Sequence, residues 1–218
     1  MQSIEKNIIT IKEKINLAKK MGQEVGLIAI SKYFPVNKIQ EAINAGQNIF
    51  GENKVQEAKE KWPELKKQNP KIELHLVGHL QSNKTKDAVA IFDVIQTLDS
   101  IKLAKILQKE IIKKRRNLKI FIQVNIGREK QKNGIDPDEI GNFLEELKVL
   151  KEFDISGIMC IAPKDENPEK YFQEISSLAK KHNLKNISMG MSSDFETAIK
   201  NGSNFVRIGT AIFGSRDG

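Results

Sequence analysis

The order of apolar and polar segments predicts an α/β fold, a closed (β/α)8 barrel of the TIM type with one extra helix before the first strand. Short apolar runs rich in Val, Ile and Phe alternate with longer segments whose apolar residues recur at helical spacing. Eight such pairs can be counted in the 218 residues, and this alternation implies parallel strand pairing. Glycine or proline separates most of the segments, as is typical of turns. We therefore expect residues 1–218 to form one barrel domain.

The segment before the first strand, residues 3–21, has an apolar residue at every third or fourth position, with Lys and Glu between them. The apolar stripe consists of Ile4, Ile8, Ile11, Ile15 and Ala18. Gly22 follows the stripe and is placed to end a helix. This segment is the predicted extra helix.

Eight apolar runs are expected to be the strands. Residues 118–126 form the clearest one because Ile, Val and Phe fill most positions, whereas 48–51 and 204–208 are weak. If one or two of the weak runs were loops, the alternative would be an open, doubly wound sheet with fewer strands. In chain order the expected strands are 27–32, 48–51, 72–77, 93–98, 118–126, 155–161, 186–189 and 204–208.

The segments between these strands carry signals for helix ends. Asp99 or Ser100 can cap a helix that begins at Ile101, and Pro137 suits the first turn of another helix. Gly202 is placed to end the last long helix. The expected helices are 36–45, 54–67, 82–92, 101–116, 136–151, 167–182 and 194–201, and a helix-like tail follows at 209–214.

The composition favours a chain of a reducing compartment. Its one cysteine, Cys160, lies in the apolar run 158–161, so we expect a buried thiol and not a nucleophile. We find no secretory signal and no apolar run of membrane-spanning length, so a cytoplasmic location without membrane contact is expected. The net charge of +8 suits an anionic small molecule or nucleic acid. The densest basic run, 113–116, has no aromatic neighbours, which favours a solvated helix end over nucleic-acid binding.

Polar residues at the C-terminal ends of the expected strands are the candidate functional groups, because ligands bind at that end of a (β/α)8 barrel. Lys32 closes the first expected strand, after the apolar residues 27–30. Partial desolvation there favours a neutral, nucleophilic amine that can form a Schiff base with a carbonyl compound. The competing interpretation is a lysine whose ammonium group simply reaches solvent.

Ser192, Gly209 and Thr210 follow the seventh and eighth expected strands, where barrels of this type commonly bind phosphate. Their hydroxyls and nearby backbone N–H groups can hold a phosphate dianion; alternatively, glycine here only marks turns. Arg207 alternates with the apolar residues beside it on the last strand, so its side chain is expected to point into the barrel mouth. A guanidinium there needs an anion, a ring acceptor or a structural ion pair.

Together these groups predict a ligand that carries a carbonyl group and a phosphate. A phosphosugar in an aldolase-like barrel and pyridoxal phosphate both meet that description. No metal site is expected, because His75 and His79 are four residues apart across a strand end and not on a helix. The setting of Ser192 also lacks the pattern of a hydrolase nucleophile.

Five motifs resemble the pyridoxal phosphate homeostasis protein family in order and spacing along nearly the whole chain. They are Ile28-Ala-Ile-Ser-Lys32, Phe50-Gly-Glu-Asn-Lys-Val-Gln-Glu57, His75-Leu-Val-Gly-His-Leu-Gln-Ser-Asn-Lys84, Met189-Gly-Met-Ser192 and Val206-Arg-Ile-Gly-Thr-Ala-Ile-Phe-Gly214. The resemblance implies a fold-type III barrel like the N-terminal domain of alanine racemase. The cofactor-binding residues that it implies are Lys32 for the aldimine, Asn53 in the pocket wall, Ser192, Gly209 and Thr210 for the phosphate, and Arg207 near the pyridine nitrogen.

The resemblance further implies a protein that holds pyridoxal 5′-phosphate (PLP) as a Lys32 aldimine and contributes to intracellular vitamin B6 homeostasis. An arginine beside the pyridine nitrogen disfavours protonation there, which makes the ring a weaker electron sink. Racemases of this fold have a second, β-rich domain, whereas this chain stops at Gly218. A non-catalytic monomer without catalytic residues is therefore expected, with PLP-dependent apo-enzymes as partners. A PLP-dependent amino-acid racemase is the alternative.

Overall fold

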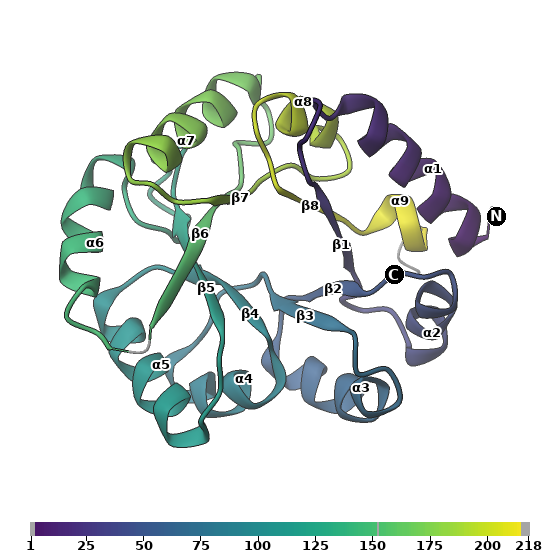
Figure 1. Cartoon of the computed structure of the whole chain (residues 1–218), viewed down its shortest axis with the longest axis horizontal. Helices are drawn as coiled ribbons and strands as arrows, with labels where there is room; N and C mark the ends of the chain where they lie inside the picture. Colours follow the sequence, from purple (N-terminus) through teal and green to yellow (C-terminus); the bar gives the residue numbers. More distant parts are fainter. Residues whose placement is uncertain (1–2, 152, 215–218) are drawn as a thin grey trace.

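Eight parallel strands form a closed barrel in the computed structural model, which describes residues 3–151 and 153–214. Each strand pairs with the next one in the chain, and β8 returns to pair with β1. The strands form the ring at the centre of Figure 1, and the helices surround it. The strands are β1 (Gly26–Ile30), β2 (Ile49–Glu52), β3 (Glu73–Leu76), β4 (Val94–Leu98), β5 (Lys119–Val124), β6 (Asp154–Cys160), β7 (Asn186–Ser188) and β8 (Phe205–Ile208).

The predicted closed barrel is confirmed, and the alternative of an open, doubly wound sheet is wrong. Both weak apolar runs are strands, because β2 pairs with β1 and β3 while β8 pairs with β7 and β1. The register of the closing pair sets Ile28 opposite Arg207. Closure of this kind leaves no strand edge exposed to other chains.

The helices lie where the sequence predicts them, with some ends shorter than expected. The helix expected at 82–92 begins as a 3-10 turn, η1 (Ser82–Lys84), which leads into α4 (Thr85–Ile91). The helix expected at 136–151 begins as η2 (Pro137–Glu139) and continues as α6 (Ile140–Leu147). No helix in the described part of the chain is long and apolar enough to cross a membrane. The others are α1 (Ile4–Ala18), α2 (Val36–Asn44), α3 (Val55–Gln68), α5 (Ile101–Lys114), α7 (Glu169–Lys181), α8 (Phe195–Lys200) and α9 (Thr210–Phe213).

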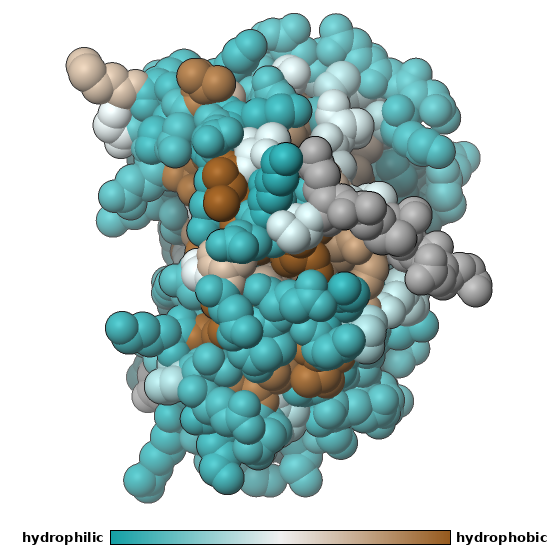
Figure 2. All heavy atoms as spheres, turned by 90° about the vertical axis from the view of Figure 1, so that its right-hand side faces the viewer, coloured by the Kyte–Doolittle hydropathy of each residue, from teal (hydrophilic) through white to brown (hydrophobic). Residues whose placement is uncertain are grey.

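Helix α1 closes the outer ring of helices. The helix after β8, α9, has only four residues, and α1 packs against α8, α9 and α2, so it fills the gap between α8 and α2 (Figure 1). Its stripe Ile4, Ile8, Ile11 and Ile15 is buried. Hydrophilic side chains cover most of this side of the molecule, and apolar ones form small, separate groups (Figure 2). The predicted extra helix thus takes the place of an eighth barrel helix.

The interior of the barrel is partly apolar and partly polar. The ring of Phe205 on β8 lies 6.0 Å from that of Phe121 on β5 and 5.6 Å from that of His75 on β3. Contacts between strands that are not neighbours cross the inside of the barrel. Gln96 and Ser188 are likewise fully buried. Buried polar side chains need hydrogen-bond partners, and those partners connect the two ends of the barrel, as described below.

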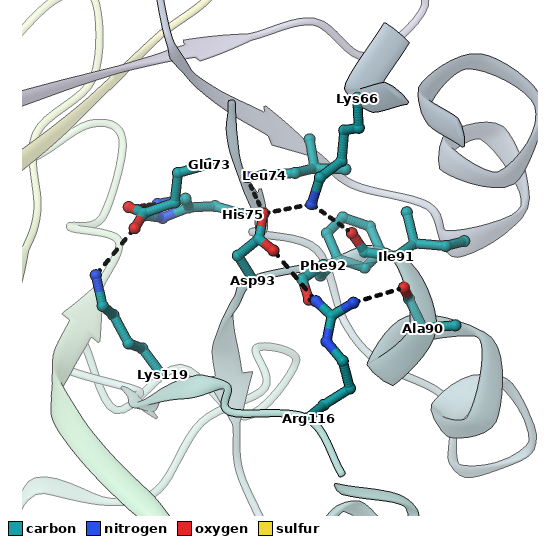
Figure 3. A network of polar contacts seen from close by, with 10 residues as sticks. All are labelled: Lys66, Glu73, Leu74, His75, Ala90, Ile91, Phe92, Asp93, Arg116 and Lys119. Atoms are coloured by element: carbon teal, nitrogen blue, oxygen red, sulfur yellow. Dashed lines mark hydrogen bonds and ion pairs between the residues drawn. The ribbon is translucent and has the colours of Figure 1, made fainter. Parts of the chain in front are cut away.

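Charged side chains cluster where β3, β4 and β5 begin. Asp93 accepts hydrogen bonds from Lys66 Nζ at 2.5 Å, from Arg116 Nη2 at 3.2 Å and from the N–H of Leu74 at 2.9 Å (Figure 3). Glu73 pairs with Lys119 at 2.9 Å and with His75 at 2.8 Å. We call these residues the base network: Lys66, Glu73, His75, Asp93, Arg116 and Lys119.

The base network corrects one expectation for the basic run 113–116. Arg116 also donates hydrogen bonds to the carbonyl groups of Ala90 and Phe92, at 3.1 and 2.9 Å. It is half-buried and therefore joins α5 to the end of α4, so the interpretation of the whole run as a solvated helix end is wrong for this residue. Its fixed position follows from Asp93, a partner 23 residues away in the sequence.

Candidate functional site

A cavity of about 190 Å³ opens at the C-terminal ends of the strands and is lined by all six residues that the sequence marks as candidates. Four apolar residues complete its wall. The lining residues are Ile30, Lys32, Asn53, Val77, Ile161, Met191, Ser192, Arg207, Gly209 and Thr210. These residues come from β1, β8 and the segments after β1, β2, β3, β6, β7 and β8, so only the closed barrel brings them together.

Lys32 is carried on a tight turn and not on the strand itself. Strand β1 ends at Ile30, two residues earlier than expected, and the N–H of Phe34 donates to the carbonyl group of Ser31 at 3.1 Å. Between them, Tyr33 has a φ angle of 66°, in the left-handed region that few residues other than glycine adopt. Lys32 is half-buried there. Lys32 therefore lines the cavity from a conformationally constrained turn.

Asn53 directly follows β2 and is held close to the neighbouring loop. A Cβ atom on Gly78 would lie 2.2 Å from the carbonyl oxygen of Asn53, so only glycine permits this approach. The carbonyl group of Gly78 accepts a hydrogen bond from Thr97 Oγ1 at 2.9 Å, which fixes the loop to the end of β4. Gly78 thus places the backbone of Asn53 at the cavity wall.

Arg207 lies on β8, is only 5% exposed, and has its side chain at the cavity. Its Nη1 donates to Ser188 Oγ at 2.8 Å, and its Nη2 donates to the carbonyl oxygen of Cys160 at 2.8 Å. Burial lowers the pKa of Arg207 from its ordinary value near 12.5, yet a guanidinium stays charged at neutral pH. Both acceptors are uncharged, so among the described residues the competing interpretation of a structural ion pair is wrong.

Cys160 behind this arginine behaves as the sequence predicts. Its side chain is fully buried, and burial raises the pKa of the thiol to about 12. The thiol is therefore protonated at neutral pH and is no nucleophile. Its carbonyl group, by contrast, orients the guanidinium of Arg207.

A column of buried hydrogen bonds connects Arg207 with the base network. Ser188 Oγ donates to Gln96 Oε1 at 2.7 Å, and Gln96 Nε2 lies 2.8 Å from His75 Nδ1. Since the amide must donate, Nδ1 accepts, and the Nε2–H of the neutral ring donates to Glu73 at 2.8 Å. Burial lowers the pKa of His75, which agrees with a neutral ring. Every donor in the column points from the mouth towards the base.

Ser192 follows β7, and Gly209 and Thr210 lie where β8 leads into α9, at the two positions that the sequence marks for a phosphate. Gly190 has a φ angle of 93°, and a Cβ atom there would lie 2.6 Å from Ala198 Cβ, so the loop after β7 requires glycine. A Cβ atom on Gly209 would lie 3.3 Å from the carbonyl oxygen of Ile30, which leaves little space for a side chain. These approaches bring two hydroxyl groups to the rim of one cavity.

The cavity has the electrostatic character of an anion site. Of its ten lining residues, Lys32 and Arg207 carry cationic groups and none carries a carboxylate. Ser192 and Thr210 add hydroxyl donors at the exposed rim. The arrangement can therefore hold an anionic ligand and present an amine to it.

In the described part of the chain, a neighbouring cavity of about 310 Å³ shares only Asn53 among the six candidate residues. Another of about 340 Å³ lies beside α1 and the start of β1, and a surface groove of about 690 Å³ runs beside α6; neither contains any of the six candidate residues. Within the described ranges no three His, Cys, Asp or Glu side chains are grouped as a metal site would require. His75 bonds to Glu73 and Gln96, whereas His79 pairs with Asp99 at 3.4 Å, so the two histidines have separate partners.

Sequence reasoning missed the residues that support this site. Gln96 and Ser188 could have been found, because each is a polar residue that follows an apolar residue within a predicted strand. The apolar wall residues Ile30, Val77, Ile161 and Met191 gave no distinguishing signal, since apolar residues are expected throughout a barrel.

Known proteins resemble this chain over its whole length. The family described as alanine racemase, N-terminal domain, matches residues 2–217. A curated relative from Pasteurella multocida, named pyridoxal phosphate homeostasis protein, is 39% identical and covers 99% of this chain and 98% of its own. A relative of the same name from Escherichia coli K12 is 34% identical and covers 100% of this chain and 98% of its own.

Solved structures agree with these relatives. PipY of Synechococcus elongatus PCC7942 is 35% identical and covers 97% of this chain and 100% of its own. Its structure without PLP matches with a TM-score of 0.90, and its structure with PLP bound matches with 0.86. An alanine racemase of Clostridium difficile matches with a TM-score of 0.74 at 13% identity, over 98% of this chain and 58% of the racemase, which shows a shared fold.

Proposed function

The chain belongs to the pyridoxal phosphate homeostasis protein family, within the wider family of alanine racemase N-terminal domains, and on that premise we propose that it binds PLP at the mouth of its barrel. The single observation that carries the proposal is one cavity lined by Lys32, Asn53, Ser192, Arg207, Gly209 and Thr210 together. By holding a reactive aldehyde in this cavity, the protein contributes to the control of free PLP and hence to vitamin B6 homeostasis.

The residues present fit the chemistry of that cofactor. PLP has an aldehyde, a phosphate dianion and a pyridine nitrogen. The cavity offers an amine, two hydroxyl groups beside a glycine backbone, and a buried guanidinium, and none of its ten lining residues is acidic. A dianion gains from such surroundings, and a carboxylate in the wall would have opposed it.

Lys32 is the residue that we propose to hold the cofactor covalently. Its nitrogen forms a C=N bond with the aldehyde carbon, and the aldehyde oxygen leaves as water with two hydrogens that the nitrogen gives up. Ser192, Thr210 and the backbone of Gly209 hold the phosphate, and Asn53 lines the pocket. The constrained turn at Tyr33 supports this role, because it fixes where the amine is presented.

Arg207 makes binding without turnover the better proposal. Its guanidinium stays charged and is oriented by Ser188 and Cys160. It offers only N–H donors, so it can donate to an unprotonated pyridine nitrogen but cannot accept a hydrogen bond from a protonated one. An unprotonated ring is a weak electron sink. We expect no racemisation of alanine or serine by the purified protein above background; turnover abolished by Lys32→Ala would instead support the alternative racemase.

On the same premise we expect the protein to act as a cytoplasmic monomer that exchanges PLP with apo-enzymes. The match to relatives over 98% of their length supports a shared role. Transfer is checked by mixing the loaded protein with an inactive apo-enzyme and following recovery of its activity. Light scattering of the purified protein measures its mass directly.

The test of the proposed function is a mass spectrum. The protein is mixed with PLP, reduced with borohydride and digested, and the modified peptide is identified. We expect one adduct, on Lys32, and none after Lys32→Ala, whereas Lys38→Ala on the exposed face of α2 should leave the adduct unchanged. Label scattered over many lysines would contradict the proposal.

A further inference from the structure

A second lysine, Lys61 of α3, holds the turn that carries Lys32. Its side chain is only 9% exposed, and its Nζ donates to the carbonyl oxygens of Ser31 at 2.9 Å and Phe34 at 3.3 Å. These are the two residues that flank Lys32 and Tyr33. Lys61 does not line the cavity, so it acts on the ligand only through the turn.

Two carboxylates complete the contact between α3 and the turn. Glu57 Oε1 lies 2.8 Å from Lys61 Nζ and accepts the N–H of Tyr33 at 2.5 Å. Glu52 is fully buried; its Oε1 lies 2.8 Å from Lys61 Nζ and accepts Ser31 Oγ at 2.8 Å. The turn is thus bonded at four points, on three of its four residues: Ser31 O, Ser31 Oγ, Tyr33 N and Phe34 O.

This arrangement does not stabilise the fold as well as apolar packing would. Burying an ammonium and a carboxylate is rarely more stable than packing apolar side chains of the same size. The left-handed conformation of Tyr33 is a further cost, and it persists only where the surroundings enforce it. Both costs lie beside the one amine in the cavity wall.

We propose that Lys61, Glu52 and Glu57 form a clamp that positions Lys32 for covalent bond formation with the aldehyde of its ligand. The clamp rests on the proposed function and names positioning residues for it, none of which touches the ligand. The ammonium group of Lys61 has three N–H donors and four oxygen acceptors within 3.3 Å. Because all its donors are used, Lys61 does not compete with Lys32 for the aldehyde. Lys32, in the same turn, lines the cavity.

The test separates covalent from non-covalent binding. Affinities are measured for PLP and for pyridoxine 5′-phosphate, which has a hydroxymethyl group in place of the aldehyde and cannot form the C=N bond. In Lys61→Met we expect PLP to bind at least about tenfold more weakly, because Lys32 is no longer placed, while binding of the alcohol changes less than about twofold. The PLP adduct should also form more slowly.

Lys59→Met is the matched control, because Lys59 lies on the same helix and pairs with Asp87 at 3.0 Å without contacting the turn. It should leave both affinities unchanged. Where Lys61→Met folds poorly, Glu57→Gln provides the same test: Glu57 is 21% exposed, and the glutamine keeps an acceptor for Tyr33 but loses the charge. It should weaken PLP binding in the same sense, by a smaller factor.

The possible results show separately whether the clamp fails and whether the proposed function fails. Equal losses for both ligands would show that Lys61 only stabilises the fold, and unchanged PLP affinity would show that Lys32 needs no clamp; either result overturns the clamp alone. If the unaltered protein itself does not prefer the aldehyde over the alcohol, the proposed function fails and the clamp fails with it.

Discussion

The two ends of the barrel use charge in opposite ways. In the base network, the carboxylates of Glu73 and Asp93 are each bonded to two cationic or imidazole groups (Figure 3). At the mouth, Lys32 and Arg207 share a cavity whose ten lining residues include no carboxylate. At the base, each carboxylate is paired with cationic or imidazole groups, and these pairs join neighbouring elements, whereas the cavity at the mouth keeps positive potential for a ligand. This division follows the general separation of stability and function in (β/α)8 barrels.

Removing the central carboxylate of the base should cost the most stability. Asp93→Ala leaves Lys66, Arg116 and the N–H of Leu74 without their shared acceptor. We expect the free energy of unfolding in urea to fall by about 3 kcal/mol, with unchanged PLP affinity of the folded protein. Asp87→Ala, which removes an exposed pair with Lys59, should cost less than about 1 kcal/mol. A loss of PLP affinity in Asp93→Ala would show that the two ends are not independent.

The second-largest effect should be a loss of stability at low pH, when Glu73 of the base network is protonated. Hydrogen bonds from His75 and Lys119 lower the pKa of Glu73 to about 2 from a value of 4.5 in the unfolded chain. The folded protein binds fewer protons in this range, so the stability from Glu73 is present above pH 4.5 and is lost as the pH falls towards 2. With allowance for partial exposure we expect about 2 kcal/mol, measured by urea unfolding across that range. Glu73→Gln should remove this part of the pH dependence; an unchanged curve would contradict it.

A substitution at the mouth should lower PLP affinity and leave the free energy of unfolding nearly unchanged. Arg207→Met removes two hydrogen bonds but also the cost of burying a guanidinium, so we expect the free energy of unfolding to change by less than about 1 kcal/mol. PLP affinity should fall about tenfold, measured by fluorescence titration. Arg116→Met at the base is the matched control and should lower stability while sparing affinity. Equal profiles for both variants would remove the distinction between the two ends.

The smallest effect is expected from a single hydroxyl group at the rim. Ser192→Ala should weaken PLP binding about threefold, because Ser192 is exposed and water can replace its hydroxyl as a donor to the phosphate, which leaves a net contribution of about 0.5–1 kcal/mol. Ser193→Ala is the control, since this neighbouring serine does not line the cavity. Unfolding curves of both variants should match that of the unaltered protein. A loss of more than about tenfold for Ser192→Ala would mean that the phosphate depends on this residue far more than on Gly209 and Thr210.

The barrel could be predicted from the sequence because its signals are local. Alternating apolar runs and helical stripes mark every strand and helix, and the residues at the strand ends follow once the barrel is assumed. The ends of strands and helices differ from the prediction by a few residues. The strand expected at 27–32 ends at Ile30, because the tight turn begins directly after Ser31 donates its N–H to the carbonyl group of Gly51. The helix expected at 136–151 ends at Leu147.

The supporting contacts could not be predicted because their partners are distant in sequence. Ser188 and Gln96 are 92 residues apart, and no pattern in either strand names the other. Lys61 and Glu57 have the i,i+4 spacing of an ordinary ion pair on a helix surface, so the sequence does not mark them. Only the structure shows that both side chains bond to the turn that begins at Ser31.

The closing position of α1 has a consequence for synthesis of the chain. Helix α1 precedes every strand of the barrel, yet Asn7 donates a hydrogen bond to the carbonyl group of Ile212, 205 residues later, at 2.9 Å. At about 5–20 residues per second, the apolar stripe of α1 waits about 10–40 s for the segment that covers it. Until that segment has been synthesised, the buried apolar stripe of α1 lacks its contacts with α9.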